Sequence, residues 1–182
     1  MTVQEVVDQC NRLMNNSSNW PRIMHIADKF GEGEYEVDGS HRYDVKIELL
    51  SSLADKGCYV AMNRLGVIYW NGDNVKQDLD KAFRLFEKAA EHGDAPAKEN
   101  LAWMLIMGPN HLKDVQRGIT LCLDALDENS HSSVFYTLAC AYEKGAGVKQ
   151  NIDLAFYFYQ MAVAMGSAED IPHAENEPQI LN

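Results

Sequence analysis

Residues 61–95 read AMNRLGVIYWNGDNVKQDLDKAFRLFEKAAEHGDA, and this pattern recurs twice further along the chain. Shifted by 36 positions it falls on residues 97–131, and shifted by 73 positions it falls on residues 134–168. The same residue types then coincide in phase: leucine at 65, 101 and 138, glycine at 72, 108 and 145, and alanine at 89, 125 and 162. A repeat of this length is typical of a helical solenoid, in which each unit buries its apolar face against its neighbours.

Each unit is predicted to fold as a helix, a turn and a second helix. In the first helix the small Gly66 lets a neighbouring helix approach closely. Gly72 ends that helix, because glycine adopts the left-handed backbone conformation without strain. The second helix begins at an aligned N-cap residue, which is Asp78, Asp114 or Asn151. It closes at Gly57, Gly93 or Gly166, with Asn129 in the equivalent place of the third unit.

The rest of the chain is arranged around these units. Residues 1–20 are predicted to form an N-terminal cap, with an amphipathic helix over 2–14 that covers the open end of the stack. Residues 21–168 form the repeat region, divided into a degenerate unit 21–57 and the units 58–95, 96–131 and 132–168. Residues 169–182 form an acidic tail with two prolines, which is either loose or anchored as a cap by Ile171, Ile180 and Leu181. A four-helix bundle with accidental internal similarity is the alternative architecture.

The phased residues resemble the Sel1-like repeat family, relatives of the tetratricopeptide repeats. The second unit carries the pattern at Ala61, Leu65, Gly66, Tyr69, Gly72, Val75, Asp80, Lys81, Ala82, Phe86, Ala89, Ala90, Gly93 and Ala95. The fourth carries it at Leu138, Tyr142, Gly145, Gly147, Val148, Asp153, Ala155, Tyr159, Ala162, Gly166 and Ala168. The third unit departs from it, because Pro109 to Leu112 replace the Gly-Val turn and Gly118 replaces an alanine. The resemblance implies an all-α fold, a right-handed α-α superhelix, that acts as a protein-binding scaffold.

Charge and composition narrow the class of partner. The chain of 182 residues has a formal net charge of −11, which argues against nucleic acid and would steer a basic protein toward the surface. An ordinary solvated acidic surface is the plainer interpretation of the same charge. No secretion signal and no apolar run of membrane-spanning length stand in the sequence, and the four cysteines form no CxxC pair. We therefore expect a cytoplasmic protein with reduced thiols and no membrane partner.

No sequence motif for catalysis, cofactor binding or metal binding stands out. The six histidines form no HExxH pattern and do not pair with cysteine at metal-ligand spacing. GxSxG and P-loop patterns are also missing, and paired acids such as Asp78 and Asp80 suit a helix N-terminus. We therefore expect a protein that is not an enzyme and needs no cofactor.

A partner surface is predicted on the first helix of each unit, because solenoids of helix pairs present these helices on their concave side. The faces turned away from the repeat contacts carry an apolar and aromatic strip with polar neighbours, formed by Asn63, Val67, Trp70, Asn71, Glu99, Trp103, Ile106, Met107, Tyr136 and Glu143. Tryptophan and tyrosine often dominate interface energetics. The alternatives are sideways packing between units and a homodimer through the same strip.

Two functions follow as hypotheses. The first is a cytoplasmic adaptor or inhibitor that binds a protein partner in the concave groove. The second is a bacterial immunity protein that neutralises a basic toxin enzyme, which the acidic net charge favours. The resemblance extends to some small immunity proteins, although the repeat motif does not mark that role.

Overall fold

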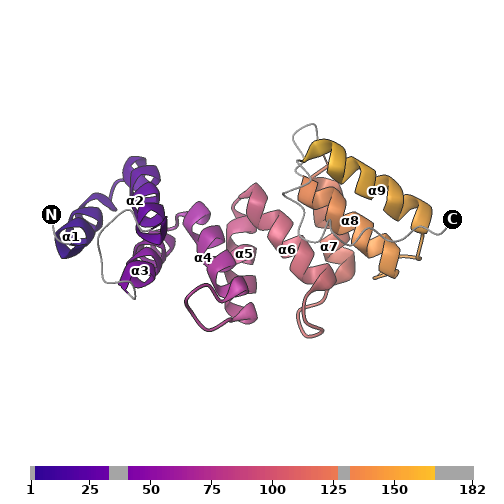
Figure 1. Ribbon diagram of the computed structural model, residues 1–182, viewed down its shortest axis with the longest axis horizontal. Helices are drawn as coiled ribbons and strands as arrows, with labels where there is room; N and C mark the ends of the chain where they lie inside the picture. Colours follow the sequence, from indigo (N-terminus) through magenta and orange to yellow (C-terminus); the bar gives the residue numbers. More distant parts are fainter. Residues whose placement is uncertain (1–2, 33–40, 127–131, 167–182) are drawn as a thin grey trace. The chain divides into compact units, whose positions relative to one another are not determined.

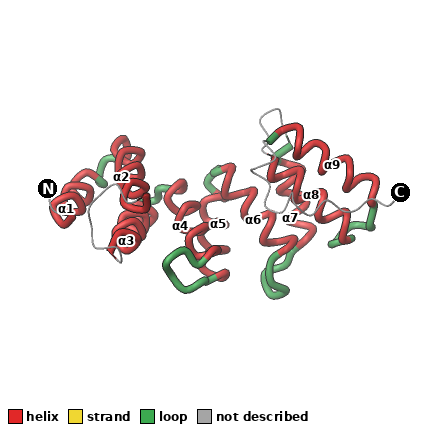
Figure 2. The backbone as a smooth tube through the Cα atoms, viewed as in Figure 1, coloured by secondary structure: helices red, strands yellow, loops and turns green. Residues whose placement is uncertain are grey.

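The computed structural model describes residues 3–32, 41–126 and 132–166, and over these residues the chain is all-helical (Figures 1 and 2). It divides into two compact units, Met1–Ala97 (unit 1) and Lys98–Asn182 (unit 2). The described part contains a 3-10 turn, Ser17–Asn19, and nine α-helices: α1 Val3–Leu13, α2 Trp20–Glu32, α3 His41–Asp55, α4 Tyr59–Asn71, α5 Leu79–Glu91, α6 Ala95–Met107, α7 Val115–Asp124, α8 Ser132–Lys144 and α9 Ile152–Met165. The predicted all-α repeat fold is confirmed.

Helix α1 contributes to an apolar core cluster that it shares with α2, α3 and α4 of unit 1. Val7, Cys10 and Met14 recur at helical spacing and are buried against the first helix pair. The other face of α1 is polar, because Gln4, Glu5, Asp8 and Gln9 are exposed. Thr2, the first residue of the predicted helix, lies outside the described residues. Helix α1 thus gives the first helix pair a covered inner side and a polar outer side, as a terminal cap does.

The turns of the second, third and fourth repeat units are each held by a backbone hydrogen bond that recurs in phase. The N–H of Asp78 donates to the carbonyl of Tyr69 at 2.9 Å, and Asn151 donates to Tyr142 in the same way at 3.0 Å. Asp114 donates to Leu105 at 3.1 Å, so the third unit keeps this bond although its turn sequence differs. The three donors also cap the second helices: their side chains accept hydrogen bonds from the N–H groups of Lys81, Arg117 and Leu154.

The predicted glycine positions are mostly confirmed, with one correction. Gly72 ends α4 in the left-handed conformation with a φ of 78°, and Gly57 and Gly93 also have positive φ. Gly166 ends α9 but is extended, with φ −124° and ψ 157°, so the left-handed closure predicted there is wrong. A side chain at Gly166 would meet Ser132 at the start of α8, and this close approach is what requires glycine. Asn129 lies outside the described residues.

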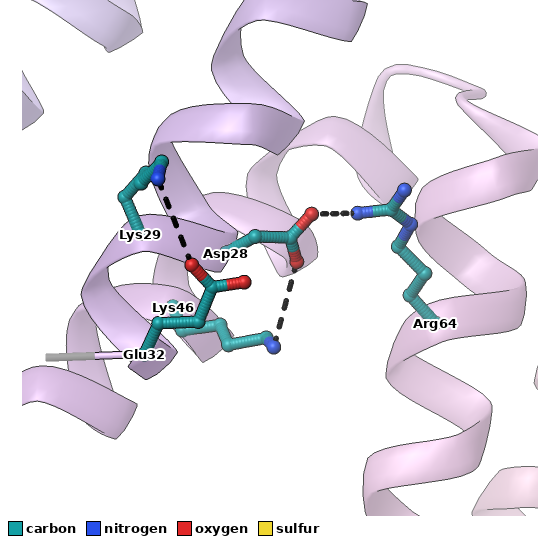
Figure 3. Close-up of polar contacts among 5 residues, drawn as sticks. All are labelled: Asp28, Lys29, Glu32, Lys46 and Arg64. Atoms are coloured by element: carbon teal, nitrogen blue, oxygen red, sulfur yellow. Dashed lines mark hydrogen bonds and ion pairs between the residues drawn. The ribbon is translucent and has the colours of Figure 1, made fainter. Parts of the chain in front are cut away.

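An acidic residue links three helices of unit 1. Asp28 on α2 accepts a hydrogen bond from Arg64 on α4, which stands 36 positions later. Its other oxygen lies 3.5 Å from the ammonium of Lys46 on α3 (Figure 3). Both cations reach Asp28 from different helices, and the three side chains are only partly exposed, so the pairs are screened less than ordinary surface pairs. Asp28 therefore fixes α4 against the first helix pair.

Unit 2 consists of α6 after its first turn, α7, α8 and α9. Its core joins Ala102 and Ile106 of α6, Ile119 and Cys122 of α7, and Val134, Leu138 and Ala141 of α8. Helices α8 and α9 lie side by side as a hairpin (Figure 1), and the ring of Phe158 on α9 packs against this core. Helix α8 thus supplies apolar side chains to contacts with both α7 and α9.

Candidate protein-binding surface

Three aromatic rings of unit 2 meet on α6, α8 and α9. Trp103 on α6 stacks on Tyr136 on α8, with ring centroids 5.8 Å apart and an angle of 23° between the planes. Tyr136 in turn meets the edge of Tyr159 on α9, with centroids 5.7 Å apart. Each ring is half-buried, so each keeps part of its surface for solvent. We call Trp103, Tyr136 and Tyr159 the aromatic cluster.

A chain of hydrogen bonds joins the aromatic cluster to an acidic side chain. The hydroxyl of Tyr159 donates to Oε2 of Glu143 at 2.9 Å, and the Sγ of Cys140 lies 3.5 Å from the same hydroxyl. Because a carboxylate only accepts, the consistent order runs from the Cys140 thiol to Tyr159 and on to Glu143. This chain fixes the Tyr159 ring and holds the Glu143 carboxylate beside the cluster.

Both phenols of the cluster are neutral at ordinary pH. Burial raises the pKa of Tyr136 to about 12, with a smaller contribution from the neighbouring Cys140. Burial also raises the pKa of Tyr159, and the hydrogen bonds to Cys140 and Glu143 act in the same direction. Neutral phenols can donate hydrogen bonds, so the direction of these hydrogen bonds, from Cys140 to Tyr159 to Glu143, persists over the physiological pH range.

A second acidic side chain lies on the other flank of the cluster. Glu99 stands one helical turn before Trp103 on α6 and accepts a hydrogen bond from the hydroxyl of Ser133 on α8. This bond connects the two helices that carry the stacked rings. The arrangement therefore combines an apolar, aromatic surface with a carboxylate on either side.

The structure brings four of the predicted residues together: Glu99, Trp103, Tyr136 and Glu143 all belong to this site. Met107 packs against the core of unit 2 and is half-buried. Ile106 is a correction, because its side chain is completely buried in that core and is not exposed as predicted. Gly118 of α7 leaves room for it: a β-carbon there would lie 2.6 Å from Cγ1 of Ile106.

The remaining predicted residues lie in unit 1. Asn63 and Val67 are half-buried, and Asn71 is exposed and donates a hydrogen bond to Asp73 at 3.2 Å. Trp70 is half-buried and meets the ring of Phe86 edge-on, with centroids 5.7 Å apart. This contact lies within the second repeat unit, so it is not the sideways packing between neighbouring units that was the alternative. The alignment of Trp70 with Trp103 would join the two units and stays a prediction.

Two residues of the site escaped sequence reasoning. Tyr159 occupies the aromatic position of the repeat that Phe86 fills in the second unit, where the ring is fully buried. Its position in the motif therefore predicted a core residue. The signal against that prediction was its hydroxyl group, because a buried tyrosine hydroxyl usually hydrogen-bonds to a polar partner. Ser133 is the second residue of α8 and stands among small polar residues, and no pattern singles it out.

The described part of the chain offers neither a metal-binding cluster nor a membrane-spanning helix. No group of three or more His, Cys, Asp and Glu side chains there is arranged to hold a metal ion. Among the helices that the structure describes, none is long and apolar enough to cross a membrane. All four cysteines are buried free thiols.

The comparisons with known proteins identify the repeat. The family model of the Sel1 repeat matches residues 60–94 and 136–167, which fall in the predicted second and fourth units. The structure of a Sel1 repeat protein from Oxalobacter formigenes is similar, with 24% sequence identity and a TM-score of 0.67. The match covers 90% of the present chain and 71% of the Oxalobacter chain. A protective antigen of uropathogenic Escherichia coli strains, displaying an SLR fold, shares 25% identity and a TM-score of 0.69, covering 83% of this chain.

The chain spans about a third (32%) of the length of that antigen. No curated protein matches the sequence of the present chain. Sel1 repeats generally serve as protein–protein interaction modules. The matched stretches, the two similar structures and the recurring turn bond all agree on the repeat. The chain carries Sel1-like repeats.

Proposed function

We propose that this protein is a non-enzymatic, cytoplasmic binding module, an adaptor or inhibitor, whose aromatic cluster in unit 2 contacts a protein partner. The observation that carries the proposal is the stacked pair Trp103 and Tyr136, held half-buried on successive first helices. They contact each other and Tyr159, and each of the three rings keeps part of its surface exposed to solvent. Rigid aromatic side chains that are already partly desolvated lose little conformational entropy on binding, which favours them as interface anchors.

The flanking carboxylates define the chemistry of the partner. Glu99 and Glu143 are held by hydrogen bonds from Ser133 and Tyr159, so they are positioned before a partner arrives. An arginine or lysine side chain fits this surface, since it can lie against an aromatic ring and pair with a carboxylate. The net charge of −11 would also draw a basic partner to the protein. The partner is therefore a protein segment that carries at least one cationic side chain.

The experiment is affinity capture from the native cell with three baits: the wild-type chain, Trp103→Ala and Leu123→Ala. Leu123 is an exposed apolar residue of α7 in the same unit, outside the aromatic cluster, and serves as the matched control. A protein captured by the wild-type and Leu123→Ala baits but lost from Trp103→Ala supports the proposal, once direct titration with that purified protein repeats the result. Equal capture by all three baits contradicts it.

A second candidate function rests on the acidic charge. An immunity protein that neutralises a basic toxin enzyme would have the same cationic partner and the same non-catalytic role. The two candidates differ in the consequence of binding. Inhibition of the captured protein's enzymatic activity, with a toxin gene beside the gene for this chain, would favour the immunity role over an adaptor.

A further inference from the structure

Helix α9 leaves an apolar stripe exposed in unit 2. Ile152 is 54% exposed, Phe156 45% and Val163 55%. Spacings of four and seven residues place these side chains on one face of the helix, and we call them the α9 stripe. Asp153 is the only charged residue of the helix. An exposed face of this kind on a soluble protein commonly marks an interaction site.

The equivalent face of α7 shows what such a stripe normally contacts. Val115 and Ile119 of α7, and Leu126 two residues after its end, stand 37 positions before the α9 stripe, and all three pack in the core of unit 2. Their neighbours in that core include Val134 and Leu138, on the first helix of the next pair. The α9 stripe therefore has the character of a face that a further helix covers.

A second copy of the chain can supply that helix in one way. Its first helix pair is already covered by α1, whose outward residues are polar, so it offers no open counterpart of the kind that α8 offers to α7. Its own α9 is apolar and carries a single charge. In a protein with a net charge of −11, a helix face with so little charge lets two copies meet with little repulsion.

We propose that the protein forms a homodimer in which α9 packs antiparallel against α9 of a second copy. A contact of one patch with itself is isologous, so it closes as a dimer and does not grow into a filament. The two-fold axis then passes near the middle of the stripe, close to Phe156. Ile152 of one copy comes to lie beside Val163 of the other, whereas these residues lie about 16 Å apart within one helix.

The first measurement is the mass in solution, by sedimentation equilibrium of the full chain over a concentration series. The wild-type protein is expected to approach twice its chain mass of 20.5 kDa. In the double variant Phe156→Glu and Val163→Glu the dimer dissociation constant should rise by about 100-fold or more, because like charges are brought together in an apolar contact. Leu123→Glu, equally exposed on α7, is the control and should leave the dimer intact.

Cysteine cross-linking tests the antiparallel arrangement without placing charge on the helix. Chains with Ile152→Cys mixed with chains with Val163→Cys should form a disulfide-linked pair, while either variant alone should cross-link poorly. The four native thiols are buried, so they interfere little under native conditions.

Three results would overturn the proposal. One is a wild-type protein that stays monomeric throughout the concentration series. Another is a dimer that survives both glutamate substitutions or shows no mixed cross-link. The third is a monomer that dimerises only when residues 167–182 are deleted, since the stripe would then be covered by the protein's own C-terminal segment.

Discussion

Gly66 on α4 faces Phe86 on α5 so closely that a β-carbon at residue 66 would lie 2.6 Å from Cε1 of the ring. Phe86 is completely buried, so its ring has little room to move away. Gly66→Leu is therefore expected to lower the free energy of unfolding by about 2–4 kcal/mol through overpacking. Urea unfolding measures the change. A variant as stable as the wild type would show that α4 and α5 do not meet in this register.

Gly57 allows the cost of backbone strain to be measured without steric overlap, because there is free space around it. No atom lies within 4 Å of a β-carbon at Gly57, yet its φ is +88°. Gly57→Ala should therefore lower the free energy of unfolding by about 1 kcal/mol through the left-handed backbone alone. Comparison with Gly66→Ala in the same unfolding experiment isolates the overlap. A larger loss at Gly57 than at Gly66 would contradict this assignment.

The free energy of unfolding should depend on pH through the aromatic cluster. Tyr136 loses its proton near pH 12 in the folded chain but near 10 when unfolded, so the unfolded state releases protons first as pH rises. The stability contributed by the neutral phenol is complete below pH 10 and is lost between pH 10 and 12. Tyr136→Phe should make the decline over this range shallower.

The exposed Tyr157 gives the control for that experiment. Tyr157→Phe should leave the slope of unfolding free energy against pH close to that of the wild-type protein. Equal slopes for wild type and Tyr136→Phe would mean that the Tyr136 hydroxyl is not buried by its neighbours.

The thiols should react only when the chain unfolds. All four cysteines are buried, and burial raises the pKa of Cys122 to about 12, so thiolate is scarce at neutral pH. Alkylation should be slow in the native protein and reach four groups per chain in denaturant. Mass measurement with and without reductant should agree. A mass increase on reduction would reveal a disulfide and weigh against a reducing compartment.

The repeat architecture was predictable because its signals are local and recur in phase. Asp78, Asp114 and Asn151 each cap a helix through the side chain, and Gly72 stops one through its backbone, so the sequence around each position was sufficient. Gly166 shares the position of a left-handed glycine but meets Ser132 instead. Its conformation depends on a tertiary contact that the local sequence does not record.

The residues of the candidate binding surface were harder to predict, because the exposure of a side chain depends on what packs against that side of its helix. Ile106 follows Trp103 by three positions and was expected on the same outward face, yet it fills the space that Gly118 leaves on α7. Tyr159 has the position of a core aromatic residue but turns its hydroxyl to Glu143. Periodicity predicted the helices on which these side chains lie, and it could not distinguish flanks that are covered from flanks that are open.

The most direct test of the proposed function is calorimetric titration of the captured partner against wild type, Trp103→Ala and Leu123→Ala. Trp103→Ala should weaken binding by about 2 kcal/mol, roughly 30-fold, because it removes the ring stacked on Tyr136. Its melting temperature should stay close to that of the wild type, and Leu123→Ala should bind normally. If Trp103→Ala instead unfolds the protein while its folded fraction binds with wild-type affinity, Trp103 is a core residue and the aromatic cluster is not the partner surface.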